Sequence, residues 1–258
     1  MAAAATGAFF AFEGVSKAFG GNPVLDDVSF DVRPGETVCI MGRSGVGKSV
    51  SLRLLMGFLK ADSGRVIAAG EDITGWTEPQ LHELHKKVTL VFQSGALFDS
   101  LTVGDNVAFP LREQNHHSEQ ETAEVVDRLL DMLEISRFRD EFPASLSTGM
   151  KRAVAIARAL AARPQAILYD EPTTMVDPMM VHVIADLMRK VREQVKLTSV
   201  VVTHDTRLAR QIGDRLVFLH DGRARFFGTI AEMEASPDPV LRSFLQQDEG
   251  SLLQPLRR

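Results

Sequence analysis

The most informative part of the sequence is the run Gly42-Arg43-Ser44-Gly45-Val46-Gly47-Lys48-Ser49. It fits the phosphate-loop pattern, in which a glycine is followed by four residues and then by Gly, Lys and Ser or Thr. Glycines let the backbone bend tightly, so that successive N–H groups can point at phosphate oxygens, and a helix that begins at about Lys48 adds its positive end. We expect Lys48 to reach the phosphates and the Ser49 hydroxyl to bind Mg²⁺.

The residues on both sides of this loop support the interpretation. Thr37 to Met41 form a short apolar, β-branched run, as a buried strand should. From Ser51 to Leu59, apolar residues recur with a helical spacing, at Leu52, Leu55, Met56 and Leu59. A glycine-rich turn that matched the pattern by chance would not be expected to have a strand before it and a helix after it.

The composition sets limits on the class of protein. The chain has 258 residues, 45% of them hydrophobic and 24% charged, which suits one large domain or a core domain with an inserted lobe. The formal net charge of -5 argues against a nucleic-acid binder. Cys39 is the only cysteine, which excludes a disulfide framework and a cysteine-based metal site, and we expect it to pack as a small apolar residue.

Membrane and export signals are not evident in the sequence. No apolar run reaches the roughly 18 to 20 residues that span a bilayer, and the start of the chain lacks the basic residues of a signal peptide. We therefore expect a soluble, cytoplasmic chain, for which a role at the membrane would need a partner subunit.

The rest of the chain alternates between strand and helix patterns. Phe9 to Gly14 and Val28 to Val32, with a turn at Gly20 to Pro23, predict an antiparallel piece near the N-terminus. Leu101 to Ala162 predicts an inserted helical lobe, which ends in a helix capped by Ser147. The other predicted strands are Arg65 to Ala69, Val88 to Phe92, Ala166 to Tyr169, Ser199 to Val202 and Leu216 to Leu219, and the other predicted helices are Pro79 to Lys87 and Pro178 to Val195.

The candidate functional residues follow the ends of four predicted strands. Strands that alternate with helices indicate a parallel sheet with right-handed crossovers, in which ligands bind beyond the carboxyl ends of the strands. The residues that follow these four strands are Gly42, Gln93, Asp170 and His204. We therefore expect all of the candidate chemistry to lie along one edge of the sheet.

Asp170 and Glu171 are adjacent carboxylates with separable tasks. Asp170 would take part in the shell of Mg²⁺, a hard cation that accepts one or two carboxylates and keeps waters. Glu171 would accept the proton of an attacking water molecule. By themselves these two residues would equally suit a charged junction at the surface, but the phosphate loop in the same chain favours the functional interpretation.

The order of these motifs resembles the ATP-binding subunits of ABC transporters. The resemblance covers about residues 8 to 235, with the phosphate loop, Gln93, the signature Ser147-Thr148-Gly149-Met150, the strand end Leu168-Tyr169-Asp170-Glu171, Asp177 and His204 in the family's order. It implies an α/β P-loop NTPase fold with an N-terminal antiparallel β piece and an inserted α-helical subdomain. The implied ATPase domain is 8–246, with a RecA-like core at 8–98 and 163–235, a helical subdomain at about 99–162 and a tail at 247–258.

The resemblance also implies a role for each motif. ATP and Mg²⁺ would be held between two chains paired head to tail as a homodimer, with Ser147, Thr148 and Gly149 reaching the γ-phosphate of the partner's ATP. The other implied contacts are the loop from Gly42 to Val50 on the phosphates, Lys48, Gln93, Glu171 and His204 in catalysis, Ser49, Gln93 and Asp170 on Mg²⁺, Asp177 coupling the two sites and Phe19 stacking on adenine. Phe19 taken alone would suit a core residue as well.

Two motifs depart from the family pattern. The usual signature is Leu-Ser-Gly-Gly-Gln, and this chain has Thr148 and Met150 instead of the first glycine and the glutamine. The family's common Gly-Leu-Asp is here Met175-Val176-Asp177. Neither change removes a catalytic group, but both leave the turnover rate open.

A narrower resemblance concerns the transported substrate. The Gly149-Met150 ending of the signature is similar to the ATPase of bacterial phospholipid transporters of the mammalian-cell-entry class, the Mla system. The segments Val91 to Asp99, Asn106 to Arg112 and Ser236 to Leu245 are similar to that class as well. The implied partners are membrane permease subunits, a small regulatory subunit and a lipid-binding protein with a mammalian-cell-entry domain, and the implied location is the cytoplasmic face of the bacterial inner membrane.

We also expect two further segments to take part in contacts with partner subunits or to be disordered. Phe92, Leu97 and Phe98 would form an apolar notch beside Gln93 for a short helix of the permease, although Phe92 suits a core position equally well. The tail from Leu241 to Arg258 would be either disordered or an extension that crosses the dimer.

Three other functions stay open. An importer ATPase for amino acids or another small solute would use the same chemistry. A soluble ABC protein that acts on DNA or ribosomes is disfavoured by the single set of motifs and by the acidic charge. A regulatory module that hydrolyses little ATP is disfavoured by the presence of Glu171 and His204.

Overall fold

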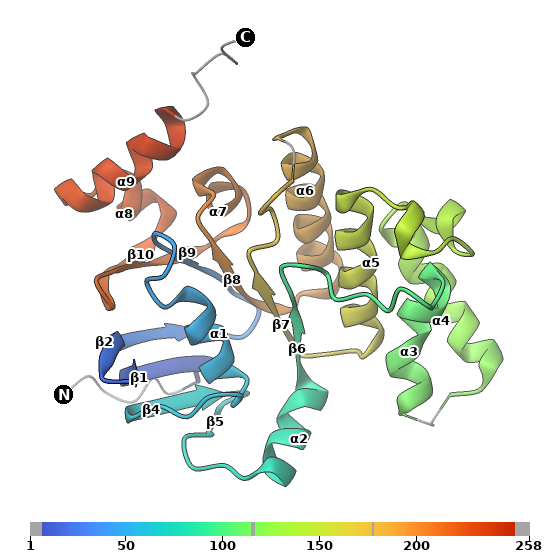
Figure 1. The fold of residues 1–258 in the computed structure, drawn as a ribbon, viewed down its shortest axis with the longest axis horizontal. Coiled ribbons are helices and arrows are strands. Elements are labelled where there is room, and N and C mark those ends of the chain that lie inside the picture. The colour runs from blue at the N-terminus through green and yellow to red at the C-terminus, as the bar shows by residue number, and fades with distance from the viewer. Residues whose placement is uncertain (1–6, 115–116, 177, 251–258) are drawn as a thin grey trace.

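A computed structural model of the chain describes residues 7–114, 117–176 and 178–250, and Figure 1 shows how its elements are arranged. The central sheet has six strands and confirms the predicted parallel arrangement, because five strands run parallel and only β10 is antiparallel. In spatial order the strands are β10 (Arg223–Thr229), β9 (Arg215–His220), β3 (Thr37–Met41), β8 (Thr198–Thr203), β7 (Ala166–Asp170) and β6 (Val88–Val91). The five parallel strands lie within one residue of their predicted bounds, and β10 was not predicted.

The strand, loop and helix around the phosphate loop are present as predicted. All five residues of β3 are buried, and α1 (Lys48–Leu55) begins at the lysine of the motif. Gly47 precedes α1 with a φ of 101°, a left-handed conformation that favours glycine. The predicted continuation of the helix to Leu59 was wrong, because the backbone leaves the helix after Met56, the C-cap.

A second, antiparallel sheet of four strands lies beside the first. Its order is β2 (Asn22–Val32), β1 (Phe10–Phe19), β4 (Ser63–Ala68) and β5 (Glu71–Asp72). The antiparallel pairing of the first two strands was predicted, but both are longer than expected. The pairing of β1 with β2 shifts in register between Phe12 and Val15 but continues to Phe19, so the predicted end of the strand at Gly14 was wrong.

The segment after β6 is helical, as predicted. It consists of α3 (Val103–Glu113), α4 (Glu119–Met132), two short 3-10 turns (Ser136–Phe138 and Pro143–Ser145) and α5 (Thr148–Ala161). Figure 1 shows this group on the side of the molecule away from the antiparallel sheet. Ser147 is the N-cap of α5, and its hydroxyl accepts a hydrogen bond from the backbone N–H of Met150 at 3.3 Å.

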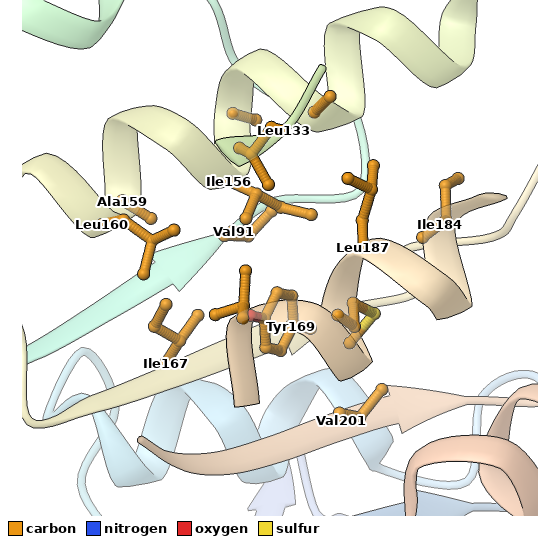
Figure 2. Packing of buried hydrophobic residues seen from close by; sticks show 14 of the residues in the cluster. Val91, Leu133, Ile156, Ala159, Leu160, Ile167, Tyr169, Ile184, Leu187 and Val201 are labelled. Atoms are coloured by element: carbon orange, nitrogen blue, oxygen red, sulfur yellow. The ribbon is translucent and has the colours of Figure 1, made fainter. Parts of the chain in front are cut away.

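The described strands of the central sheet contribute to two hydrophobic cores. In β3, Val38 and Ile40 belong to the core that includes α1 and the antiparallel sheet, whereas Cys39 and Met41 belong to the core on the other face. Figure 2 shows part of the second core, in which Tyr169 of β7 is surrounded by side chains from β6, α5 and α6 (Pro178–Val195). The residues labelled there are Val91, Leu133, Ile156, Ala159, Leu160, Ile167, Tyr169, Ile184, Leu187 and Val201.

The remaining helices are α2 (Glu78–Lys87), which was predicted, and α7 (Thr206–Ile212), α8 (Ile230–Ala235) and α9 (Pro239–Gly250), which were not. Because Leu241 and Leu245 of α9 are buried, disorder is the wrong interpretation for the part of the tail up to Gly250. Residues 251–258 lie outside the described part of the chain. None of the described helices is long and apolar enough to cross a membrane.

Candidate functional site

A cleft of about 590 Å³ lies at the carboxyl ends of the parallel strands. It brings together the phosphate loop, Gln93, Glu171 and His204. For these groups, the structure agrees with the expectation that the functional residues lie along one edge of the sheet. The described residues that line it are Val24, Arg43, Ser44, Gly45, Gly47, Lys48, Ser49, Val50, Gln93, Glu171, Thr174, His204 and Phe244.

Lys48 is the buried cation of the cleft. Its Nζ donates hydrogen bonds to the carbonyl oxygens of Gly42 at 2.9 Å and Arg43 at 3.1 Å. It also lies 3.2 Å from Oε1 of Glu171. The lysine thus joins the loop to the acidic end of β7, and its side chain is only 7% exposed. A triphosphate on the loop would offer Lys48 a stronger anionic partner than two neutral carbonyls.

Ser49 and Asp170 form the candidate Mg²⁺ site. The Ser49 hydroxyl donates a hydrogen bond to Oδ1 of Asp170 at 2.8 Å. Burial raises the pKa of the Asp170 carboxyl, and the bond from Ser49 opposes part of that effect. The hydroxyl, the carboxylate and the amide oxygen of Gln93 are oxygen donors of the kind that Mg²⁺ prefers, so these residues fit the ion.

The protein would supply only part of the Mg²⁺ shell. No group of three or more His, Cys, Asp or Glu residues in the described ranges is arranged to hold a metal by itself. Phosphate oxygens and waters would have to complete the six ligands that Mg²⁺ requires. The site therefore suits an ion that enters together with a nucleotide.

Glu171 is the most constrained acid in the cleft. Its Oε2 accepts hydrogen bonds from Nδ1 of His204 at 2.8 Å and from the Thr174 hydroxyl at 3.1 Å, and its Oε1 faces Lys48. Burial acts to raise the pKa of Glu171, but the bond from His204 and the charge of Lys48 outweigh it, so the pKa lies below its ordinary value. The carboxylate is therefore ionised at neutral pH, as a proton acceptor must be.

Several of the predicted site residues do not line the cleft. Gly42, Val46 and Asp170 lie beside it without being part of the lining, and Asp177 is outside the described residues. Ser147, Thr148 and Gly149 at the start of α5 are not in the lining either. Phe19 is also missing from the lining, and its 44% exposure shows that it is not a core residue.

Three lining residues were missed in the sequence. Thr174 follows Glu171 by three residues, so its place in the same loop was a usable signal. Val24 follows the predicted turn at Gly20 to Pro23 and was assigned to no element, whereas it belongs to β2. Phe244 comes from α9, almost 200 residues after the phosphate loop, and although it lies in the segment Ser236 to Leu245, that resemblance implied no place for it in the cleft.

The motifs and the fold agree with the comparisons to known proteins. Residues 25–174 match the family model described as ABC transporter, which is more than half of the chain. The chain belongs to the ABC transporter family. The family's nucleotide-binding cassettes are ATPases that bind ATP, and the phosphate loop of this chain is the motif that such binding requires.

Curated relatives include transport proteins for different solutes. The chain is 35% identical over 233 residues to the "Probable ribonucleotide transport ATP-binding protein mkl" of Mycobacterium leprae, covering 90% of this chain and 67% of the relative. It is 38% identical over 229 residues to the methionine import ATP-binding protein MetN of Cupriavidus metallidurans, covering 87% and 66%. The chain thus spans about two thirds of the length of these relatives.

Two solved structures place the chain among ABC cassettes. The cassette MJ0796, a dimer in a post-hydrolysis state bound to ADP and Pi, is 33% identical, with a TM-score of 0.77 over 86% of this chain and 98% of that one. The protein cbiO1 of Clostridium perfringens, part of the ABC transporter complex cbiONQ, is 27% identical, with a TM-score of 0.83 over 96% and 98%. The predicted P-loop ABC ATPase fold is therefore confirmed.

Proposed function

We propose that this chain binds Mg-ATP in the cleft and hydrolyses it at the interface of a head-to-tail homodimer, and that hydrolysis drives a membrane permease. The observation that carries the proposal is the position of Glu171, an ionised carboxylate held by Lys48 and His204 in the cleft that contains the phosphate loop. A phosphate site next to an oriented base is what phosphoryl transfer to water needs.

The residues of the cleft would have separate roles in ATP hydrolysis. The loop N–H groups and Lys48 bind the β- and γ-phosphates, and Glu171 takes a proton from the water whose oxygen attacks the γ-phosphorus. The bond from the γ-phosphorus to the bridging oxygen breaks, and ADP leaves. His204 holds Glu171 through the bond from Nδ1, and Gln93 positions the water. Mg²⁺, held by Ser49, Asp170 and Gln93, would compensate the phosphate charge.

The dimer supplies the residues that one cleft lacks. Ser147 and Thr148 are exposed at the N-terminus of α5 and do not line the cleft of their own chain, which leaves them available to the partner's ATP, whereas Gly149 is buried in the single chain. The similar cassette MJ0796 is described as dimeric and bound to ADP and Pi. The backbone N–H groups of a helix N-terminus would bind the γ-phosphate. Asp177 would couple the two sites, and residues 247–258 would extend across the pair.

Binding and pairing can be tested together. We expect purified wild-type protein with Mg²⁺ to retain ATP and to change from monomer to dimer, measured by light scattering, and Lys48→Ala to weaken nucleotide binding. A folded protein with Mg²⁺ that neither retains adenine nucleotide nor pairs when it is added would refute the proposed function.

The permease would dock beside Gln93. Phe92 and Phe98 are 44% and 41% exposed, so the interpretation of Phe92 as a core residue was wrong. Leu97 packs partly against the core, and the Phe98 ring lies 4.6 Å from that of Phe109. These residues would form the apolar notch that a short helix of the permease enters.

The notch can be tested by co-purification with the permease. We expect Leu97→Asp with Phe98→Asp to abolish co-purification while ATP binding persists. The control is Phe58→Asp, at a phenylalanine that is 50% exposed outside the notch. Unchanged co-purification of the double variant would rule the notch out.

We propose phospholipid, moved between bacterial membranes, as the transported substrate. The support is the Gly149-Met150 signature and the three segments that are similar to the mammalian-cell-entry class. A permease, a small regulatory subunit and a protein with a mammalian-cell-entry domain would be the partners, and the chain would be held at the cytoplasmic face of the inner membrane through the permease.

A second candidate is the ATPase of a small-solute importer. The relatives favour it, because they include methionine import proteins and the sulfate/thiosulfate import protein CysA 1 of Chromobacterium violaceum, which is 38% identical over 228 residues. Purification of the complex from native membranes separates the two candidates. A mammalian-cell-entry subunit with bound phospholipid would support the first, and a solute-binding protein for an amino acid or an anion would support the second.

A further inference from the structure

Helix α9 is fixed against the body of the protein by its first residues. Oδ1 of Asp238 accepts hydrogen bonds from the backbone N–H groups of Val240 and Leu241, at 2.8 and 3.0 Å. The same carboxylate pairs with Arg225 of β10 at 2.8 Å. Leu241 and Leu245 are 1% and 7% exposed, so one face of the helix is buried against the core. The position of α9 is therefore set by packing and by a cap.

Phe244 lies between this buried face and the cleft. Its ring is 5.0 Å from that of Phe218 in β9, with 48° between the two planes. It is only partly buried, and it lines the cleft together with the phosphate loop. The sequence motifs of the family give no role to a residue at this position.

The lining of the cleft includes both polar and apolar groups. The loop amides, Lys48 and Glu171 suit the phosphates, whereas an adenine ring needs an apolar surface on which it can stack. The apolar side chains in the described lining are Val24, Val50 and Phe244, and Phe244 is the only aromatic one. Phe19 is outside this lining, although it precedes Val24 by only five residues.

We propose that Phe244 contacts the nucleoside part of the bound nucleotide and that α9 is thereby a nucleotide-binding element of its own chain. The inference rests on the proposed function, because it needs a nucleotide in the cleft. It adds a binding residue from the C-terminal helix to the loop residues at the phosphates. It also means that occupation of the cleft stabilises the docked position of α9.

The test compares ADP with inorganic tripolyphosphate, both with Mg²⁺, by calorimetry on the full chain. Tripolyphosphate can bind through its phosphates alone, because it has no base or ribose. We expect Phe244→Ala to raise the Kd for ADP about 10-fold, which corresponds to about 1.4 kcal/mol, and to leave the Kd for tripolyphosphate unchanged. Phe244→Tyr should restore ADP binding, since it keeps the ring. Phe58→Ala, at an exposed phenylalanine outside the cleft, should change neither Kd.

Hydrogen exchange gives a second readout on the same proteins. ADP should slow amide exchange in residues 239–246 of the wild type, and tripolyphosphate should not. If Phe244→Ala fails to fold, Phe244→Leu keeps the apolar volume without the aromatic face and should still lose ADP affinity selectively.

Three results would overturn the inference. They are an unchanged Kd for ADP in folded Phe244→Ala, an equal loss for both ligands, and a selective loss that occurs only in Phe19→Ala. A folded wild type that binds neither ADP nor tripolyphosphate would refute the proposed function as well, so the two failures are distinguishable.

Discussion

At the scale of single residues, Glu171 carries the sharpest prediction. Glu171→Gln keeps the size of the side chain and removes its ability to take a proton. We expect hydrolysis, measured as phosphate release, to fall by at least ~10² while ATP binding and the ATP-bound dimer persist. The control is Glu83→Gln, an acid whose only described ion pair is with Lys86 on α2. Retained turnover in the Glu171 variant would refute its assignment as the base.

The pKa of Glu171 leads to a second prediction, on stability against pH. Because its pKa in the folded protein is below the ordinary 4.5, the ionised group stabilises the fold above that pH, and this contribution is lost as the pH falls through the lowered value. The difference in Tm between the wild type and Glu171→Gln should therefore shift against the wild type on acidification below 4.5.

The pKa of Asp170 is shifted in the opposite direction from that of Glu171. Its pKa is raised, chiefly by burial, so its ionisation costs the folded state stability above the ordinary value, and acidification relieves that cost. The Tm of the wild type relative to Asp170→Asn should therefore shift in favour of the wild type as the pH falls. Equal pH profiles for the wild type and both variants would contradict the two assignments.

At the scale of elements, the start of α5 combines a structural and a functional role. Ser147→Ala removes the cap to the Met150 N–H and should cost about 1 kcal/mol, or a Tm lower by ~2–4 °C. Ser147→Asp keeps a capping oxygen but would place a negative charge against the partner's γ-phosphate. We expect the Asp variant to retain the wild-type Tm and to lose ATPase activity. A variant that retains both would exclude Ser147 from the γ-phosphate contact.

The same scale shows which elements the sequence could predict. β3, α5 and α6 were predicted because buried strands and amphipathic helices leave periodic apolar patterns, and because Ser147 and Pro178 mark helix starts. α7 was missed because its seven residues are too short for a clear period, and β10 because Arg223 and Arg225 interrupt its apolar residues. For the site, strand ends predicted Gln93 and His204, but the approach of Phe244 depends on tertiary packing alone.

At the scale of the whole molecule, Arg215 is one of the described residues that join the two sheets by ion pairs. Arg215 of β9 pairs with Asp31 of β2 at 2.8 Å and with Glu36 at 2.5 Å, and its side chain is 12% exposed. Removing one partner leaves poorly hydrated carboxylates without a countercharge. We expect Arg215→Ala to lower the free energy of unfolding by about 3 kcal/mol, measured by urea denaturation. Adding Glu36→Gln should recover part of the loss, and a single variant as stable as the wild type would contradict this role.

The lone cysteine of β3 has a practical consequence. Cys39 is completely buried, and burial raises the pKa of its thiol to about 12, so it is neither accessible nor ionised while the chain is folded. A pulse of alkylating reagent therefore modifies only molecules in which unfolding has exposed Cys39. The fraction of modified protein measures the population of such molecules. Fluorophores or spin labels attached to engineered surface thiols would report on motion of the native assembly without a cysteine-free background.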